Sequence, residues 1–266
     1  MTTLIQAPTA RPMAALTAVS LALVLLGLIW AVFDPRLIDG SATWAKPLKF
    51  AISFVVTFGT LAIILPRFSP AWRNGLLFWS LTTLMGAAML FEMTYMVTQA
   101  AQGEASHFNF ATPFTRAMYA LMGVGAVTLV ASIGAFGWAA LRDTDASFGP
   151  ATRQGVAWGF IGSFVLTMIT AGTMSSMAGH FIGTPGPDAA TIPLMGWSGT
   201  LGDLRPAHFL ALHMMQALPL FGFWLDRQNT GALTAVRYVR IAAVLYAVVT
   251  LGLFVQALLG LPVIRL

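Results

Sequence analysis

The segment MAALTAVSLALVLLGLIWAVF, residues 13–33, contains no charged side chain and no proline. A helix needs about 20 mostly apolar residues to cross the hydrocarbon core of a bilayer, and this segment is long enough to do so. It is longer than the roughly 7–15 apolar residues of a secretory signal, and no small-residue cleavage motif follows it at the right place. We therefore expect a retained transmembrane helix here.

Six further segments of the same kind follow, so we predict seven membrane-spanning helices in a single domain, residues 1–266. The expected spans are 13–33, 48–66, 76–100, 114–141, 154–178, 206–225 and 238–259. Pro113 and Pro206 lie at helix starts, where proline is well tolerated. Thr112 and Asp203 are the expected N-caps of these two helices. The predicted fold class is all-α, a polytopic integral membrane bundle of seven transmembrane helices.

The composition excludes a soluble protein. Of the 266 residues, 58% are hydrophobic and 9% are charged, whereas a soluble domain carries about 25% charged residues. The net charge of +5 comes from basic residues in short loops between apolar segments, which indicates membrane topology and not nucleic-acid binding. The absence of cysteine excludes disulfides, iron–sulfur clusters and cysteine nucleophiles.

The basic residues also predict the orientation, because they are enriched on the cytoplasmic side of membrane proteins. Eight would share a side with the N-terminus: Arg11, Arg67, Arg73, Arg142, Arg153, Arg227, Arg237 and Arg240. Six would lie opposite: Arg36, Lys46, Lys49, Arg116, Arg205 and Arg265. We expect a cytoplasmic N-terminus and an extracytoplasmic C-terminus, in a cell inner membrane or plasma membrane. An aromatic belt near the cytoplasmic interface would contain Trp79, Trp138, Trp158 and Trp224.

Many of the ionisable and polar residues gather in one predicted layer on the extracytoplasmic side. The layer contains all four histidines, which are His107, His180, His208 and His213. It also contains Lys46, Lys49, Glu92, Gln99, Glu104, Arg116, Asp203, Arg205 and Gln216. Because polar groups at membrane depth are costly and rarely accidental, we interpret this layer as the functional site.

The third span ends in FEMTYMVTQ, residues 91–99, which places Glu92, Tyr95, Met96 and Gln99 on one helical face. Glu92 lies about two turns inside the predicted surface. A carboxylate at that depth must be paired, protonated or metal-bound. The cations expected to neutralise it are Lys49, Arg116 and Arg205. Both a structural salt bridge and a catalytic or ligand role stay open for Glu92.

The sixth span begins with His208 and His213, which lie about 140° apart around a helix. This spacing differs from the i, i+4 pair of zincin proteases, so a shared metal is harder to arrange. Gln216 lies between the two histidines in projection. The three residues form a polar arc that either lines a pocket or consists of hydrogen-bonded core residues; we favour the pocket.

Two loops carry the other histidines. His107 lies in QGEASHFNFATPFTR, residues 102–116, and the aromatic residues Phe108 and Phe110 are expected to anchor this loop to the bundle. His180 opens the long connection of residues 179–205. Loops longer than about 12–15 residues are usually functional or disordered. We expect an ordered lid here, and for residues 184–190 a mobile connector stays an equal alternative.

Two other features have competing interpretations. Lys46 and Lys49 begin the second span, where lysine either extends to lipid headgroups, holds an anionic substrate group, or pairs with Glu92 or Asp203. Small residues recur in the fifth span at Gly155, Gly159 and Gly162. Such spacing allows close helix approach, and we expect it to serve packing within the bundle and not a dimer interface.

We interpret the chain as a membrane-embedded, metal-dependent enzyme, most simply an oxidoreductase that acts on a lipophilic small molecule. Imidazole groups suit Fe, Cu and Zn. The expected metal ligands are His107, His180, His208, His213 and Glu92. Catalytic or orienting roles are expected for Glu92, Asp203 and Gln216. The cations expected to hold the polar part of a cofactor or substrate are Lys46, Lys49, Arg116 and Arg205.

Alternatives stay open. The architecture is similar to that of the seven-helix zinc hydrolases that include alkaline ceramidases and adiponectin receptors, and this similarity implies a zinc-dependent lipid hydrolase. The histidine spacings in HFLALH and AGHFIG do not match theirs. A haem held by two histidines would indicate electron transfer, and a non-catalytic subunit or transporter would use the layer for binding or permeation. A retinal protein is excluded, because the last span has no lysine for a Schiff base. The oligomeric state stays open.

Overall fold

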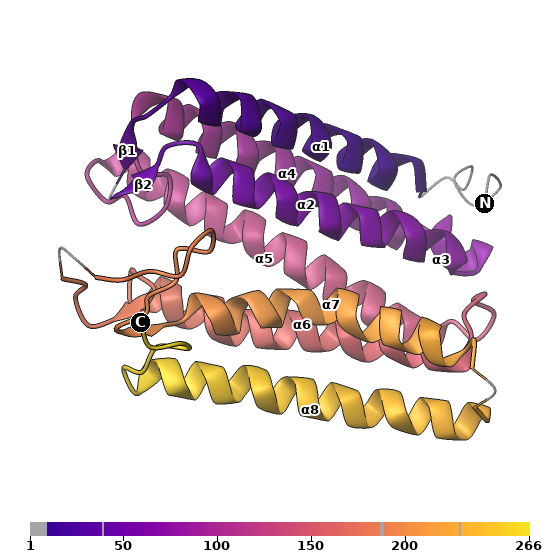
Figure 1. The fold of residues 1–266 in the computed structure, drawn as a ribbon. Helices are drawn as coiled ribbons and strands as arrows, with labels where there is room; N and C mark the ends of the chain where they lie inside the picture. Colours follow the sequence, from indigo (N-terminus) through magenta and orange to yellow (C-terminus); the bar gives the residue numbers. More distant parts are fainter. Residues whose placement is uncertain (1–9, 39, 187–188, 229) are drawn as a thin grey trace. The chain divides into compact units, whose positions relative to one another are not determined.

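The computed structural model describes residues 10–38, 40–186, 189–228 and 230–266. Within these residues seven helices are long and apolar enough to cross a membrane, which confirms the prediction and makes this a multi-pass membrane protein. The seven are α1 (Ala10–Phe33), α2 (Ala45–Ile64), α4 (Leu76–Gln102), α5 (Pro113–Arg142), α6 (Pro150–Ser176), α7 (Arg205–Leu225) and α8 (Ala232–Leu258). The short helices η1 (Leu65–Arg67) and α3 (Pro70–Arg73) link α2 to α4 (Figure 1).

Most helix ends lie within a few residues of the predicted positions, and the larger differences have a common cause. Helix α6 begins four residues before the predicted residue 154, and α8 begins six residues before residue 238. In both places an arginine, Arg153 or Arg237, lies in the additional helical residues. Long basic side chains extend from a helix end to water, so a charged residue does not end the helix where the apolar run ends.

The two expected N-caps have different outcomes. Thr112 caps α5 as predicted, because its Oγ1 accepts a hydrogen bond from the Thr115 backbone N–H at 3.1 Å. The prediction for Asp203 was wrong, because Leu204 occupies the N-cap position of α7 and makes no side-chain cap. The Asp203 carboxylate instead accepts hydrogen bonds from the backbone and guanidinium of Arg205.

The helices form two compact units. The first contains the chain through Ser132 together with Asp145–Ser147, and the second contains Ile133–Thr144 and Phe148–Leu266. Helix α5 therefore contributes to both units. The single domain expected from the sequence stays a prediction.

In the first unit, α1 packs along α2, and α2 contacts α4. Gly27 of α1 allows the close approach, because a Cβ at that position would lie 3.1 Å from Cδ1 of Leu48 on α2. Phe54 and Phe58 of α2 stack with ring centroids 5.6 Å apart, and both are buried. Between α1 and α2, β1 (Leu37–Ile38) pairs antiparallel with β2 (Ser41–Ala42).

An aspartate at the end of α1 holds this hairpin in place. The Asp34 carboxylate accepts hydrogen bonds from the Arg36 guanidinium at 2.7 and 2.9 Å, from Trp30 Nε1 at 2.7 Å and from Thr43 Oγ1 at 3.0 Å. The Arg36 guanidinium, followed by Trp30, holds the pKa of Asp34 well below its usual range. Asp34 is therefore a structural carboxylate.

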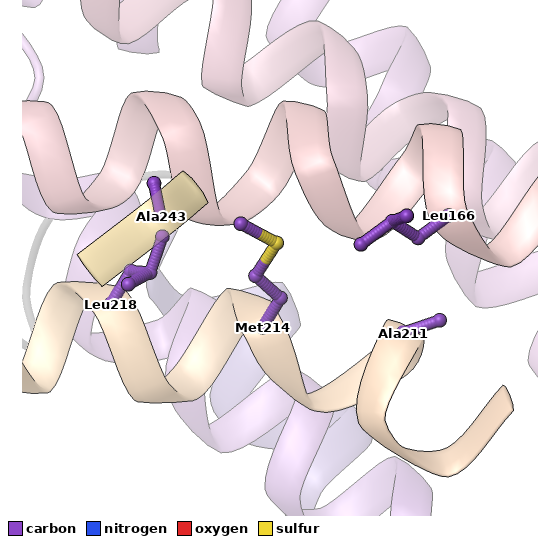
Figure 2. Packing of buried hydrophobic residues seen from close by; sticks show 5 residues of the cluster. All are labelled: Leu166, Ala211, Met214, Leu218 and Ala243. Carbon is purple, nitrogen blue, oxygen red and sulfur yellow. The ribbon is translucent and has the colours of Figure 1, made fainter. Parts of the chain in front are cut away.

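In the second unit, glycines on α6 bring α7 close. A Cβ on Gly155 would collide with the backbone of Leu218, and one on Gly159 would lie 2.9 Å from the carbonyl oxygen of Met214. The prediction that these small residues serve packing within the bundle is therefore confirmed. An apolar cluster beside this contact joins three helices; Figure 2 shows its members Leu166 from α6, Ala211, Met214 and Leu218 from α7, and Ala243 from α8.

The long connection between α6 and α7 is folded through backbone pairing. Strand β3 (Phe181–Ile182) pairs antiparallel with β4 (Gly202–Asp203), and Thr191 forms an isolated bridge with Ser198. The described parts of the expected lid are thus hydrogen-bonded. Its residues Pro187 and Asp188 lie outside the described residues.

Candidate functional site

The face of α4 expected from the sequence is buried in the first unit. Glu92 is 3% exposed, and Tyr95, Met96 and Gln99 on the same face are also buried. Their spacing places them on one side of the helix over about two turns. This confirms the prediction that the four residues share one face near the end of the helix.

Two oxygens on this face have no hydrogen-bond partner among the described residues. They are Oε1 of Glu92 and the hydroxyl of Tyr95, one helical turn apart. Leaving a buried polar group without a partner costs about 1–3 kcal/mol, and more for a charged group. Each such group in a folded protein therefore calls for an explanation in terms of strain, function or a bound species.

A glycine on α5 makes room for the carboxyl group. A Cβ on Gly125 would lie 2.8 Å from Oε1 of Glu92, which is closer than a real Cβ contact allows. The carboxyl group therefore lies directly against the backbone of α5. The second neighbour of note is Lys46 on α2, whose positive charge acts on Glu92. Lys46 was among the cations that the sequence offered as partners of Glu92, together with Lys49, Arg116 and Arg205.

The surroundings of Tyr95 are apolar. Tyr95, Met96 and Met122 form a buried cluster, against which the partly buried Phe50, Phe91 and Met118 pack. The cluster draws its members from α2, α4 and α5. The unpartnered hydroxyl thus lies among hydrocarbon and aromatic groups, where a hydrogen bond gains strength and its absence costs more.

His107 lies beside the same helices in the loop that follows α4. Its ring centroid is 5.7 Å from that of Phe50 and 6.3 Å from that of Tyr119. Its Nδ1 is 3.1 Å from Oγ of Ser106. Burial, with a smaller contribution from the charge of Lys46, lowers the pKa of His107 to about 3. The imidazole is therefore neutral at physiological pH, as a proton acceptor or metal ligand must be.

The expected anchoring of this loop by aromatic residues is confirmed. The rings of Phe108 and Phe110 contact that of Tyr119 at 5.4 and 5.3 Å. Phe108 has φ of 55°, a left-handed conformation that is strained for a bulky residue. Strain of this kind persists only where surrounding structure holds it, and it is found preferentially at functional sites.

Hydrogen bonds complete the support of the loop. The carbonyl oxygen of Ala105 accepts from Nδ2 of Asn109 at 3.0 Å and from Nε2 of Gln99 at 3.4 Å. Nε of Arg116 donates to the carbonyl oxygen of Phe110 at 2.9 Å. Gln99 and Arg116, which the sequence placed in the functional layer, therefore hold the backbone that presents His107.

The remaining charged residues of this layer in the first unit are at the surface. Lys46, Lys49, Glu104 and Arg116 are exposed. Lys46 is the residue of this group whose charge acts on both Glu92 and His107. The cofactor-binding roles expected for Lys46, Lys49 and Arg116 stay predictions.

In the second unit, His208 and His213 point their Nδ1 atoms at different partners. Nδ1 of His208 is 3.1 Å from Oγ1 of Thr170 on α6, and Nδ1 of His213 is 3.2 Å from Oε1 of Gln216. The Thr170 hydroxyl is also 3.0 Å from the carbonyl oxygen of Leu166. An amide oxygen only accepts, so His213 has a proton on Nδ1. This leaves Nε2 of the neutral His213 ring with a lone pair for another partner.

Asp203 and Arg205 pair with each other. Their closest N–O distance is 2.6 Å, and Asp203 is buried. Asp203 also accepts a hydrogen bond from Ser198 N at 2.9 Å, while Arg205 donates to the carbonyl of Gly196 at 2.6 Å. This pair fastens the lid to the start of α7. The catalytic role expected for Asp203 and the cofactor-binding role expected for Arg205 stay predictions.

His180 lies at the other end of the lid, where it is partly buried. Its ring centroid is 4.2 Å from that of Phe181, and its carbonyl accepts a hydrogen bond from Leu204 N at 2.9 Å. The predicted site residues thus form two sets, with Glu92 and His107 in the first unit and His180, Asp203, His208, His213 and Gln216 in the second.

Metal ligation has no support from the described residues, which contain no group of three or more His, Cys, Asp or Glu side chains that could hold a metal. The roles of His107, His180, His208, His213 and Glu92 as ligands stay predictions. Residues that the sequence did not single out also contribute to these sites. They are Gly125, Tyr119 and Thr170. Of these, only Tyr119 had a sequence signal, as a polar residue next to the His107 loop.

Comparison of the chain with protein-family models, with curated proteins and with solved structures gave no significant match.

Proposed function

We propose that the protein acts on a lipophilic small molecule from within the membrane, and that Glu92 is the group that exchanges a proton with it. The observation that carries this proposal is the unpartnered Oε1 of Glu92, a nearly fully buried carboxyl oxygen on a membrane-spanning helix. Ionisable groups at such positions are rare, and they are associated with binding sites and proton relays.

The neighbouring groups support a site with a defined division of roles. The Tyr95 hydroxyl, one turn from Glu92, has a proton to donate and no partner among the described residues. A carboxyl group and a hydroxyl at this spacing suit a molecule whose polar part both donates and accepts hydrogen bonds. His107 supplies a neutral imidazole on a rigidly held loop. The apolar cluster around Tyr95 suits a lipophilic body.

The charge of Lys46 bears on the choice of chemistry. Lys46 acts on Glu92 and on His107, the carboxyl and imidazole groups of the first unit that were expected to bind metal. Lys46 is exposed and its influence on both groups is secondary to their burial, but its positive charge disfavours a second cation there. We therefore favour acid–base chemistry at this site over a metal centre.

Three other functions stay proposals: a metal-dependent oxidoreductase, a zinc-dependent lipid hydrolase and a haem protein. Measurements on one purified sample can distinguish among them. Elemental analysis of the purified protein would detect Fe, Cu or Zn, and an optical spectrum would show the Soret band of a haem. We propose the extracytoplasmic side of a cell inner or plasma membrane as the location of the site, on the basis of the arginine distribution.

A lipophilic carbodiimide tests the central claim directly. Dicyclohexylcarbodiimide reaches carboxylic acids from the apolar phase, and the acid adds across a C=N bond and rearranges to a stable N-acylurea. We expect the wild-type protein in native membranes to gain one adduct on Glu92, and Glu92→Gln to gain none there. Glu104, an exposed residue in the loop that contains His107, serves as the control carboxyl group. It should react more slowly.

The substrate class is tested on the same preparations. Organic extracts of the purified wild type and of Glu92→Gln are compared by mass spectrometry. An apolar molecule enriched in the wild type and lost in the variant supports the proposal. Equal extracts together with an unreactive Glu92 would contradict it.

A further inference from the structure

A shallow groove runs along the surface of α8 in the second unit. It has a volume of about 300 Å³ and is lined by Arg237, Arg240, Ile241, Val244 and Leu245. These residues recur at spacings of three and four, so they share one face of the helix. The two arginines lie at one end of this stretch, which extends for about 12 Å along the axis, and the aliphatic residues occupy about the last 6 Å. The lining is almost entirely apolar, so the two arginines contribute the hydrocarbon parts of their side chains to it, and their guanidinium groups border it at one end.

The guanidinium of Arg240 is held in a fixed orientation. Its Nε donates to Oε1 of Gln154 on α6 at 3.1 Å, and the same oxygen accepts from Nε1 of Trp158 at 3.0 Å. Gln154 binds Nε alone, so the two terminal nitrogens of the guanidinium have no hydrogen-bond partner among the described residues. A guanidinium presented in this way matches the oxygens of a phosphate group.

The charge at this end is not neutralised within the part of the chain that the structure describes. Neither Arg237 nor Arg240 forms an ion pair with a carboxylate there, and both side chains are exposed. Two adjacent guanidinium groups without acidic partners attract an anion. The charge of the arginines therefore indicates that the molecule bound in the groove is negatively charged.

The position of the arginines relative to the membrane indicates the chemical class of the molecule that binds in the groove. Trp158, which shares Gln154 with Arg240, is 40% exposed, and exposed tryptophans on membrane-spanning helices lie at the level of the lipid headgroups. Ile241, Val244 and Leu245 continue from there into the span of α8 and are all exposed. An occupant of the whole groove therefore has an anionic head at the interface and a hydrocarbon chain in the bilayer.

We propose that this groove is a binding site for an anionic phospholipid, whose phosphate contacts Arg237 and Arg240 and whose acyl chain lies along Ile241, Val244 and Leu245. Basic side chains at the end of a membrane-spanning helix are a recognised means of binding anionic lipid headgroups. A soluble phosphate would engage the arginines alone and leave the aliphatic half of the groove unused. The lipid accounts for both halves.

Native mass spectrometry tests the proposal on the full-length protein released from bilayers of equal parts dioleoylphosphatidylglycerol and dioleoylphosphatidylcholine. The wild type should retain one phosphatidylglycerol in preference to phosphatidylcholine. The double variant Arg237→Gln/Arg240→Gln should lose this preference, with about a ten-fold fall in bound phosphatidylglycerol. Val244→Trp, which fills the groove and keeps both charges, should reduce retention to a similar degree.

Arg227→Gln is the matched control. Arg227 is another exposed arginine of the same unit, but its guanidinium lies 3.5 Å from the ring centroid of Phe223 and outside the groove. Its loss should leave lipid retention unchanged. Size-exclusion profiles and melting temperatures of all variants confirm that they fold.

Three outcomes would overturn the proposal. The first is equal retention of phosphatidylglycerol by wild type and the double variant. The second is an equal loss in Arg227→Gln, which would show general charge attraction. The third is displacement of the lipid by millimolar glycerol phosphate with Val244→Trp behaving as wild type, which would show a site for a soluble phosphate.

Discussion

Oε1 of Glu92 on α4 lies 2.8 Å from the point where a Cβ on Gly125 of α5 would be placed. The glycine therefore sets the space available to the carboxyl group. Gly125→Ala should displace the Glu92 carboxyl group. Because the oxygen in the way is the far end of a flexible side chain, the substitution should destabilise the protein by only about 1 kcal/mol, the low end of the cost of overpacking. Carbodiimide labelling of Glu92 measures the first effect, and thermal unfolding in detergent measures the second.

Two comparisons make this prediction specific. Gly123→Ala, two residues away where a Cβ would meet nothing within 4 Å, should be neutral or stabilise the helix by about 0.5–1 kcal/mol. In a Glu92→Ala background the collision is gone, so Gly125→Ala should cost little. Additive effects of the two substitutions would show that the residues do not contact each other.

Tyr95→Phe and Tyr246→Phe should have opposite effects on stability. The Tyr95 hydroxyl is buried without a partner among the described residues, whereas that of Tyr246 donates to the carbonyl of Leu210 at 2.9 Å. Removal of the first should raise the free energy of unfolding by about 1 kcal/mol, and removal of the second should lower it by about as much. A loss of stability in Tyr95→Phe, in protein from which bound molecules have been extracted, would show that the hydroxyl has a structural partner.

The sequence was sufficient to predict the seven helices, because each apolar segment is long enough to span a bilayer regardless of its neighbours. It was also sufficient for the face of α4, since Glu92, Tyr95 and Gln99 follow the helical repeat within one segment. Both features depend on local periodicity alone.

Contacts between segments were not predictable in the same way. The proximity of Gly125 to Glu92 depends on the rotation and register of α5 against α4, to which every residue at the contact contributes. The influence of Lys46 on Glu92 depends likewise on the rotation of α2. The pairing of Asp203 with Arg205 was missed for another reason, because helix propensity favours Asp203 as an N-cap, and the lid takes its carboxylate instead.

Asp226 at the end of α7 should be one of the most sensitive carboxylates outside the site. It accepts hydrogen bonds from the backbone N–H groups of Ala151 and Thr152 at 2.9 and 2.8 Å and from the Thr152 hydroxyl at 2.6 Å. It thereby caps α6 from a different helix, next to the positive end of the α6 dipole. Asp226→Ala should lower the free energy of unfolding by about 2–3 kcal/mol.

The same contact provides a graded series. Thr152→Val removes one of the three hydrogen bonds and should cost about 1 kcal/mol, while Thr152→Ser keeps the hydroxyl and should cost less. Denaturant-dependent unfolding monitored by tryptophan fluorescence gives the ranking. An Asp226→Ala protein as stable as Thr152→Ser would refute the capping role.

The buried imidazole of His107 should make stability depend on pH. Its pKa is about 3 in the folded protein, against an ordinary value of 6.5. Below pH 6.5 the unfolded chain therefore binds a proton that the folded protein does not bind, and stability falls with decreasing pH down to about pH 3. From pH 6.5 to pH 5 the loss is at most about 2 kcal/mol, at about 1.4 kcal/mol for each pKa unit. His107→Gln removes this titration, so melting temperatures measured between pH 7 and pH 5 should decrease more steeply for the wild type than for the variant. Parallel curves for the two proteins would mean that the His107 ring is solvated, and that the loop held by Phe108, Phe110 and Tyr119 does not exclude water from it.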